Sequence, residues 1–379
     1  MPYGQVVTGP PGSGKTTYCH GLSQYLTLLS RSCHLINFDP GCDPTTFMSE
    51  TVDVTFDIRK IVDLNNVMGK GWGPNGGLQW CFEYIAHNAE EVMKRVKESV
   101  IKKEREKIER IENISKEGKK ELERFSDEEI FQACYLIVDF PGQVELYTHS
   151  ESSSTILSHL TKPIQKGGHI GLNVVNVNLV DSTSIFDAGR FISTCLTTLM
   201  SCIRLSLPVV NVLTKVDLLR NQEAVFDIEF FASCDNLNPL LQYLEHGSVE
   251  ESGEYADDED FQKARQKVKD SIFYKRHKEL TEGIVEVIED YGLVNFKLLC
   301  VSDAALMGRV VAECDKVNGY VYTREEYATD DNKVNAMFKA AVKSDGFNGR
   351  QKELEDVRER YIMKNKVVEN EEEDPNPKR

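Results

Sequence analysis

A glycine-rich loop that ends in Lys-Thr occupies residues 9–17 of this 379-residue chain, with the sequence Gly-Pro-Pro-Gly-Ser-Gly-Lys-Thr-Thr. It follows a short β-branched run and opens a helical pattern, which is the context that a phosphate-binding loop needs. Backbone N–H groups of residues 12–16 and the helix N-terminus are expected to form an anion cradle. Lys15 would hold the β- and γ-phosphates of a nucleotide, and Thr16 would ligate Mg²⁺. The expected nucleotide contacts in this loop are Gly12, Ser13, Gly14, Lys15, Thr16 and Thr17.

A carboxylate at the end of an apolar run is the second chemical signal. Asp139 closes the run Tyr-Leu-Ile-Val-Asp, where a buried charge is costly unless it meets a cation. A water-mediated contact to the same Mg²⁺ would supply that cation. The residues that follow complete the pattern Asp-x-x-Gly-Gln, which resembles the switch element of GTPases. In that element the glycine N–H, here that of Gly142, senses the γ-phosphate.

Residues 214–217, Thr-Lys-Val-Asp, end another apolar run and point to recognition of a base. The carboxylate of Asp217 can accept hydrogen bonds from guanine N1–H and from the 2-amino group, whereas adenine offers no such pair of donors. Lys215 can lie along the base. Thr214 stands where Asn is usual, so we expect weaker hydrogen bonding there with the discriminating carboxylate intact. The pattern favours GTP over ATP, and Val301, in the loop 300–303, is a further expected contact near the base.

Three side chains are expected to arrange the attacking water. Asp39 lies at the tip of the second expected strand, on the carboxyl side where doubly wound sheets bind ligands. Near a γ-phosphate, such a carboxylate can orient or deprotonate water, although a role in capping or in a turn is the alternative. Gln143 and Glu145 come from the loop after Asp139 and could face the same water.

Short β-branched runs alternate with helical stretches along the chain, which predicts a mostly parallel sheet with helices on both faces. We therefore expect a doubly wound α/β domain over residues 1–323. The predicted strands are Gln5–Val7, Cys33–Phe38, Cys134–Asp139, Leu172–Val180, Pro208–Leu213 and Phe296–Val301.

Three segments look added to this α/β pattern. Residues 97–130 carry opposite charges at four-residue spacing, as in Lys102, Glu106 and Arg110, which predicts an exposed helical hairpin; an arm that docks a partner is the alternative. Residues 245–260 are acidic and predict a flexible loop. Residues 324–379 are charged and predict one or two helices, around 354–363, and then a disordered tail.

Composition narrows the class of protein. Hydrophobic residues make up 40% of the chain, and 45 basic against 61 acidic residues leave a net charge of −16. This charge disfavours general binding to nucleic acid or to anionic membranes. Ten cysteines without a C-x-x-C pair predict reduced core thiols, and the Cys/His spacing predicts no metal cluster. The chain begins almost directly in a strand, which leaves no room for a signal peptide.

Residues 71–80, Gly-Trp-Gly-Pro-Asn-Gly-Gly-Leu-Gln-Trp, are rich in glycine and contain a proline. Because glycine raises the entropy of the unfolded backbone and proline removes a hydrogen-bond donor, we expect a loop of specified shape. Pro74 would fix its approach, and the neighbouring glycines would allow close passage of the backbone.

Taken in order, the residues at 9–17, Asp39-Pro40, Gly73-Pro74-Asn75, 139–143 and 214–217 resemble the motifs of the GPN-loop GTPases. That dimeric family belongs to the P-loop class that also contains signal-recognition-particle and MinD-like switches (SIMIBI-type). The resemblance covers about residues 1–325 apart from the insertions. Residues 2–19 and 314–322 are most similar to the eukaryotic type-2 members, while the motifs at 73–84 and 139–149 are shared with type 3.

The resemblance implies a mechanism and a setting. Asn75 would reach the phosphates and the catalytic water bound by the other subunit of a dimer, formed with a second copy or with a paralogue. The implied activity is Mg²⁺-dependent GTP hydrolysis, and the implied role is assembly and nuclear import of RNA polymerase II, from a cytoplasmic protein that shuttles to the nucleus. Gly41 stands where the family usually has Ala, which is expected to loosen the switch after Asp39.

Two other readings stay open at this point. A P-loop nucleotide or polynucleotide kinase would transfer phosphate to an acceptor and would have little need for Asp217. A nucleotide-gated assembly scaffold would bind GTP while its hydrolysis is vestigial.

Overall fold

The structure, a computed structural model, describes residues 2–43, 53–112, 125–162, 170–221, 226–246, 272–321 and 347–362. Seven strands form one sheet in the order β3-β2-β4-β1-β5-β6-β7, and all neighbouring pairs are parallel. The predicted doubly wound α/β fold is therefore confirmed. The strands are β1 Tyr3–Thr8, β2 Cys33–Asn37, β3 Val54–Asp57, β4 Tyr135–Asp139, β5 Asn173–Asp181, β6 Val209–Thr214 and β7 Phe296–Leu299.

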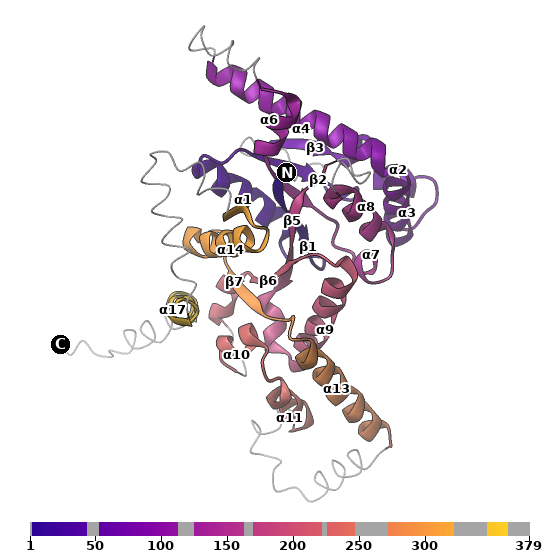
Figure 1. The fold of residues 1–379 in the computed structure, drawn as a ribbon. Coiled ribbons are helices and arrows are strands. Elements are labelled where there is room, and N and C mark those ends of the chain that lie inside the picture. The colour runs from indigo at the N-terminus through magenta and orange to yellow at the C-terminus, as the bar shows by residue number, and fades with distance from the viewer. Residues whose placement is uncertain are drawn as a thin grey trace, which may run out of the picture.

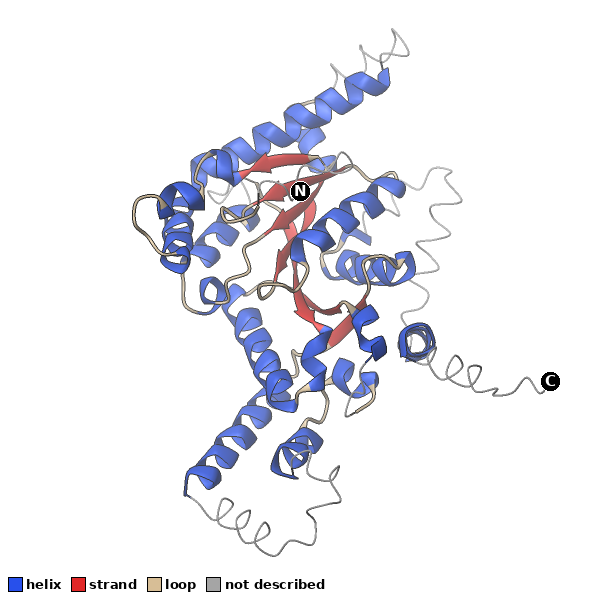
Figure 2. Cartoon of the chain, turned by 180° about the vertical axis from the view of Figure 1, so that it is seen from behind, coloured by secondary structure: helices blue, strands red, loops and turns tan. Residues whose placement is uncertain are grey.

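Helices cover both faces of this sheet (Figures 1 and 2). The α-helices are α1 Lys15–Leu28, α2 Leu64–Met68, α3 Pro74–His87, α4 Ala89–Glu112, α6 Asp127–Ala133, α7 Glu145–Thr148, α8 Ser152–Thr161, α9 Ala188–Leu205, α10 Ile228–Ser233, α11 Asn238–His246, α13 Ile272–Tyr291, α14 Ala304–Val317 and α17 Phe347–Val357. Short 3₁₀ turns are η2 Ile58–Lys60, η4 Ser182–Phe186 and η5 Val216–Asn221, and a π-helical turn, η7, spans Arg358–Ile362. Among the described residues, no helix is both long and apolar enough to cross a bilayer.

Alternation along the strands sends side chains into two cores. On β1, Val7 packs with α1 and α14, while Val6 packs on the opposite face with α3, α4 and α8. The ten cysteines are free thiols and nine of them are buried, as expected for core residues. Because the strands are parallel and in register, as in the pairing of Val7 with Asp139 and of Asp181 with Thr214, their carboxyl ends meet at one edge.

The six predicted strands are confirmed to within two residues at each end. Strand β3, Val54–Asp57, was missed; it has only four residues and lies at an edge of the sheet, where just Phe56 is buried. So short a half-buried run carries too few residues to show alternation. The pairing of β3 with β2 shifts register between Leu35 and Ile36.

Helix α4 forms most of the segment that was expected to be a solvated hairpin. Lys102, Glu106 and Arg110 are exposed, and α6 packs back on α4 through ion pairs such as Arg105–Asp127 at 2.6 Å. Residues 113–124 lie outside the described part of the chain. Full solvation of the segment 97–130 was wrong, since Val100 and Ile130 are buried within it.

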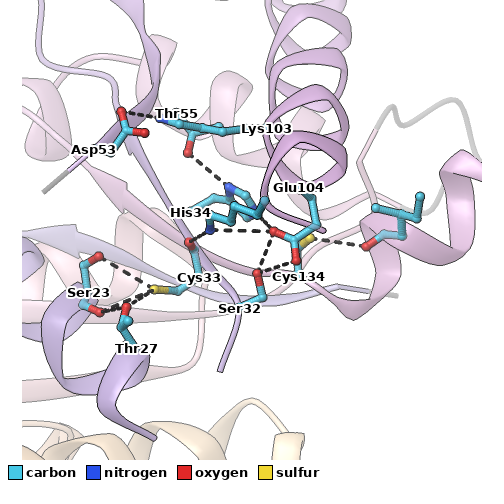
Figure 3. Close-up of polar contacts among 12 residues, drawn as sticks. Ser23, Thr27, Ser32, Cys33, His34, Asp53, Thr55, Lys103, Glu104 and Cys134 are labelled. Atoms are coloured by element: carbon cyan, nitrogen blue, oxygen red, sulfur yellow. Dashed lines mark hydrogen bonds and ion pairs between the residues drawn. The ribbon is translucent and has the colours of Figure 1, made fainter. Parts of the chain in front are cut away.

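Polar contacts also fasten α4 to the sheet (Figure 3). The Glu104 carboxylate accepts from the Ser32 hydroxyl at 2.7 Å and lies 2.9 Å from Nε2 of His34 on β2. Lys103 Nζ donates to the carbonyl oxygen of Val54, on the edge strand β3, at 2.9 Å. Sequence spacing along one helix does not reveal such contacts, because their partners are 49 to 72 residues away.

The predicted helix near the C-terminus is present as α17 and η7. Leu354 and Val357 are buried in the core that includes β7 and α14, so this segment packs on the α/β domain. The domain boundary at residue 323 stays a prediction. From residue 247 on, the acidic loop 245–260 lies outside the described residues, as do 322–346 and 363–379.

A buried ion pair joins α1 to α14. Arg31, just after α1, donates to both carboxylate oxygens of Asp315 at 2.7 and 3.1 Å. Its guanidinium lies 4.6 Å from the ring centroid of Tyr135 and 4.0 Å from that of Tyr320. A bidentate, desolvated pair of this kind is costly to break, because removal of one partner leaves the other charge buried.

We expect Asp315→Ala to lower the free energy of unfolding by roughly 3–5 kcal/mol, since Arg31 would lose its carboxylate in the interior. Urea denaturation measures the change. Glu91→Ala, which breaks the exposed Arg95–Glu91 pair on α4, is the matched control and should have little effect. Equal stability of the two variants would show that the buried pair does not stabilise the packing of α1 on α14.

Candidate active site

The glycine-rich loop turns from β1 into α1 at the carboxyl edge of the sheet. Gly9, Gly12 and Gly14 have φ angles of 139°, 78° and 88°, in the left-handed region that favours glycine. Gly14 is the N-cap of α1 and offers no side-chain cap, so the first N–H groups of the helix are free to meet an anion. The loop therefore has the backbone geometry of a phosphate cradle.

Lys15 begins α1 and is 8% exposed. Its ammonium group donates to the carbonyl oxygens of Gly9 and Pro10 at 3.1 and 2.9 Å. Burial lowers the pKa of Lys15, while the carboxylates of Asp139 and Asp39 oppose that shift. The structure thus brings both predicted carboxylates within electrostatic reach of the predicted phosphate-binding lysine.

Thr16 and Asp139 are in direct contact. The Thr16 hydroxyl donates to Oδ2 of Asp139 at 2.8 Å, and Oδ1 is buried without a hydrogen-bond partner in the described part of the chain. Burial raises the pKa of Asp139 to about 7, with Asp39 adding to the shift and Thr16 and Lys15 opposing it. Hard oxygen ligands and an unsatisfied carboxylate are what Mg²⁺ needs, so these residues fit the predicted metal.

Asp39 follows β2 and is held by a polar network at the strand tip. Its backbone N–H donates to Oδ1 of Asn37 at 2.9 Å, and its carboxylate accepts from the N–H of Gly41 at 2.8 Å. Asn37 in turn donates to Asp57, which pairs with Arg59 at 2.6 Å. Burial raises the pKa of Asp39, against the pull of the Gly41 N–H, Lys15 and Arg59. A more basic carboxylate is better suited to take a proton from water.

The segment after β4 runs beside the glycine-rich loop. A Cβ on Gly142 would lie 2.7 Å from Nζ of Lys15 and 3.0 Å from the Cα of Pro11, so a larger residue would displace the lysine or crowd the loop. The buried Tyr147 hydroxyl donates to the carbonyl oxygen of Pro141 and holds this turn in place. Gly142 is therefore placed where its backbone could meet the end of a phosphate chain.

The side chain of Gln143 links this turn to the motif at 73–75. Its Nε2 donates to Oδ1 of Asn75 at 2.7 Å, within one chain. Both side chains reach solvent, and Asn75 is the more exposed of the two. Glu145, the first residue of α7, is also exposed, and its expected contact with the water stays a prediction.

The expectation of a loop over residues 71–80 was wrong from Pro74 onward, because α3 begins there. Proline is favoured in the first turn of a helix, where its missing N–H costs nothing, and Gly73 is the N-cap. Gly77 packs against Leu64 of α2, where a Cβ would lie 3.0 Å from Cδ1. Burial of Gly77 and Leu78 offsets the low helix propensity of the paired glycines. Asn75 is thus carried on the first turn of a helix.

A cavity of about 580 Å³ adjoins the glycine-rich loop at Gly14 and Thr17. Its size suits a small-molecule ligand. It is lined by residues from three parts of the sequence: Gly14, Thr17, Gly21, Gln24, Tyr25, Leu28, Thr214, Lys215, Asp217, Cys300, Val301, Ser302, Ala304 and Met307. The predicted base contacts Asp217 and Val301 therefore share one cavity with the predicted phosphate loop.

The residues 214–217 are tied to that loop. The Thr214 hydroxyl lies 2.8 Å from the carbonyl oxygen of Ser13 and 3.0 Å from that of Val180. The weaker hydrogen bonding that is expected of Thr in place of Asn stays a prediction. Lys215, at φ 59°, donates to the carbonyl oxygen of Gly12 at 2.6 Å and to Asp181 at 2.8 Å. These contacts couple the base side of the cavity to the phosphate side.

Several residues of the site were missed. Asp181 ends β5 and holds Lys215; an acidic residue at the carboxyl end of a predicted strand was an available signal. Gln24, Tyr25 and Met307 line the cavity, but they lie within helical patterns in which nothing distinguishes them from other helix residues.

A second group of possible metal ligands lies elsewhere. His34, Glu104 and Cys134 come together although their sequence spacing predicts no cluster. Both His34 nitrogens already have partners, Thr55 and Glu104, and Lys107 lies 3.6 Å from Glu104. Burial lowers the pKa of His34 and raises that of Cys134 to about 12. A neutral thiol beside a lysine is a poor cation site, and the cluster is explained as a hydrogen-bonded anchor for α4.

Comparison with known proteins gives a consistent picture. The model of a family described as "Conserved hypothetical ATP binding protein" matches residues 7–320. GPN-loop GTPase QQT1 of Arabidopsis thaliana is 32% identical over 85% of this chain and 87% of its own length. GPN-loop GTPase 2 of Danio rerio is 32% identical over 90% and 88%, respectively. A GTPase from Pyrococcus abyssi in its apo form is similar with a TM-score of 0.48 at 18% identity, over 83% of this chain and 97% of its own.

The raised pKa of Asp139 predicts a pH dependence of stability. From its ordinary pKa up to about 7, the folded chain keeps the proton on this carboxyl while the unfolded chain loses it. The free energy of unfolding should therefore fall as pH rises through this window, by at most about 1.4 kcal/mol per pH unit. Asp139→Asn removes this contribution, so the variant should gain stability over wild type toward neutral pH. Urea denaturation without nucleotide at several pH values measures the difference; Asp235→Asn, at an exposed site, is the control, and parallel curves would contradict the assignment.

Proposed function

This chain belongs to the GPN-loop GTPase family, and on that premise we propose that it hydrolyses GTP to GDP and phosphate with Mg²⁺. The single observation that carries the proposal is the cavity in which Gly14 and Thr17 of the phosphate loop lie with Asp217. A phosphate cradle at one end and a carboxylate at the other match the two ends of guanosine triphosphate. Family members bear GTPase names, in agreement with this ligand.

Guanine is favoured over adenine, although the matching family model is described by ATP. The reason is chemical: the exposed Asp217 carboxylate can only accept hydrogen bonds, and guanine presents the N1–H and 2-amino donors together. Adenine presents no donor pair on the matching edge. The choice therefore depends on one side chain, which makes it easy to test.

Positioning and electrostatics would provide most of the catalysis. Lys15 lies where it can leave the carbonyl oxygens of Gly9 and Pro10 for the β- and γ-phosphates. Thr16 and Asp139 would hold Mg²⁺, which supplies charge neutralisation at the phosphate oxygens. Asp39, with its raised pKa, would orient the attacking water and accept its proton.

We further propose that a dimer completes the site. Asn75 is exposed and accepts a hydrogen bond from Gln143, which directly follows Gly142 beside the glycine-rich loop. Trp72, just before α3, and Tyr84, further along it, have 50% and 40% of their surfaces exposed, which suits burial by a partner. The family resemblance implies that Asn75 acts across the interface, so Gln143 would exchange its contact within the chain for one with the partner's amide.

The cellular role is also a proposal. The resemblance to type-2 GPN-loop GTPases suggests a cytoplasmic factor that shuttles to the nucleus and assists assembly and import of RNA polymerase II. The partner would be a second copy or a paralogue. The net charge of −16 fits a protein partner better than direct contact with nucleic acid.

Asp217→Asn should exchange base preference. The asparagine amide can donate to the 2-oxo group of xanthine but repels the guanine 2-amino donor, so GDP affinity should fall by about 100-fold while XDP affinity rises. Titration with fluorescent GDP, XDP and ADP measures this. Asp235→Asn controls for loss of surface charge. Unchanged GDP binding by Asp217→Asn would remove the basis for guanine recognition.

Asp39→Asn should slow GTP hydrolysis by about 100-fold or more without loss of GTP binding, since a base is removed and charge is lowered at the same place. Release of free phosphate is the measurement. Label that appears on an added acceptor instead would support the kinase reading, and an unchanged rate would rule out Asp39 as the base. Full support of the client by this variant would support the scaffold reading.

Asn75→Ala should slow hydrolysis, and mixing decides whether its amide acts across the interface. Lys15→Ala cannot hold phosphate but keeps Asn75, so equal amounts of Lys15→Ala and Asn75→Ala chains should regain activity if the amide acts in the partner's site. Gln79→Ala, one turn along α3, is the control. If Asn75→Ala is slowed and Lys15→Ala chains do not restore its activity, with or without a paralogue present, the amide acts in the site of its own chain.

A further inference from the structure

The C-terminal segment lies against the base side of the cavity, far along the chain from the motifs that form it. In Figures 1 and 2, α17 lies beside β7 and α14. Leu354 and Val357 are buried in the same core as Leu298 of β7. The buried Glu353 carboxylate accepts from the backbone N–H of Leu298 at 3.3 Å. The helix is thus fixed to the last strand of the sheet, immediately before the loop 300–303.

The next turn, η7, contacts the loop 300–303 through the carboxylate of Asp303. Asp303 uses Oδ1 to cap α14, accepting from the N–H of Ala305 at 2.9 Å. Its Oδ2 accepts from Nη1 of Arg360 at 2.9 Å and lies 3.2 Å from the hydroxyl of Tyr361. Residues 300–302, just before Asp303, line the cavity. The two carboxylate oxygens of Asp303 therefore connect this cavity wall to α14 on one side and to η7 on the other.

The same turn also holds η5, which carries Asp217. Arg220, three residues after Asp217, donates from Nη2 to the carbonyl oxygen of Arg360 at 3.1 Å. Its guanidinium lies 5.1 Å from the ring centroid of Tyr361, within reach of a cation–π contact. Tyr361 therefore contacts both segments that form the base side. Its hydroxyl contacts Asp303 in the loop 300–303, and its ring contacts Arg220 in η5.

We propose that residues 358–362, here called the C-terminal clamp, position the two base-side loops and so set the selectivity of this site for guanine. This inference rests on the proposed function, since it assigns the clamp to the same nucleotide site. Arg360 and Tyr361 are positioning residues: they act on Asp217 and Val301 through Arg220 and Asp303. Selectivity requires the two loops to be held at a fixed separation, because a carboxylate that moves loses its paired hydrogen bonds to the base first.

A purely structural role makes a different prediction. If the clamp only stabilised the fold, its loss would lower the melting temperature and weaken all nucleotides equally. A positioning role instead weakens the contacts of the base more than those of the phosphates. Inosine separates the two, because it keeps guanine N1–H but lacks the 2-amino group that Asp217 reads.

The test uses the full chain with Arg360→Ala and Tyr361→Phe combined, and Tyr361→Phe alone, which keeps the ring and removes only the hydroxyl. Affinities for GDP, IDP and ADP are measured with the melting temperature of the nucleotide-free protein. Wild type should prefer GDP over IDP by about tenfold, the value of one charge-assisted hydrogen bond. The double variant should reduce this ratio at least about threefold, and Tyr361→Phe should reduce it in the same direction. Glu359→Ala, exposed in the same turn, should leave it unchanged.

The outcomes separate the two proposals. Equal binding of GDP, IDP and ADP by wild type would overturn guanine recognition itself. A wild-type preference that both clamp variants keep in full, with or without a lower melting temperature, would overturn only the clamp. The clamp is supported if both variants have a reduced preference for GDP over IDP and Tyr361→Phe keeps the melting temperature of wild type.

Discussion

The hydrogen bond from the Thr16 hydroxyl to the buried Asp139 carboxylate joins the first turn of α1 to the end of β4. It leaves one carboxylate oxygen unsatisfied, which is an expensive arrangement for an isolated protein. The charge of Asp139 acts on both Lys15 and Asp39, so the protonation states of these three groups depend on one another. A cation or a phosphate that arrives here therefore changes the electrostatics of the whole edge of the sheet.

The parallel sheet makes that convergence possible. Strands β1, β4, β5 and β6 end almost level, so segments more than 160 residues apart meet without a dedicated scaffold. Thr214 reaches the backbone of Ser13 in this way, although 201 residues separate them. The phosphate end and the base end of the cavity are consequently parts of one surface at the carboxyl edge of the sheet.

Much of this could be predicted from sequence, because strand runs, glycine spacing and terminal carboxylates are local signals. Asp139 was identified from its place at the end of an apolar run and from the Asp-x-x-Gly-Gln pattern, and its contact with Thr16 agrees. The start of α3 at Pro74 was missed because local propensity opposes a helix there, and burial against α2 overrides it. The roles of Arg360 and Tyr361 were beyond reach for another reason: their partners are 57 and 58 residues away, and nothing local marks either residue.

Two of the three segments outside the α/β pattern, those that contain α4 and α17, share one physical effect. The sheet has free edges at β3 and β7, where unpaired backbone groups invite another strand to add. Lys103 of α4 covers a carbonyl oxygen on β3, and Glu353 of α17 covers an N–H on β7. The positive Lys103 thus faces a carbonyl oxygen at the β3 edge, and the negative Glu353 faces an N–H at the β7 edge. These contacts oppose edge-to-edge aggregation of the domain at both edges of the sheet. A chain shortened before α17 would leave the edge of β7 open to pairing with a strand of another molecule.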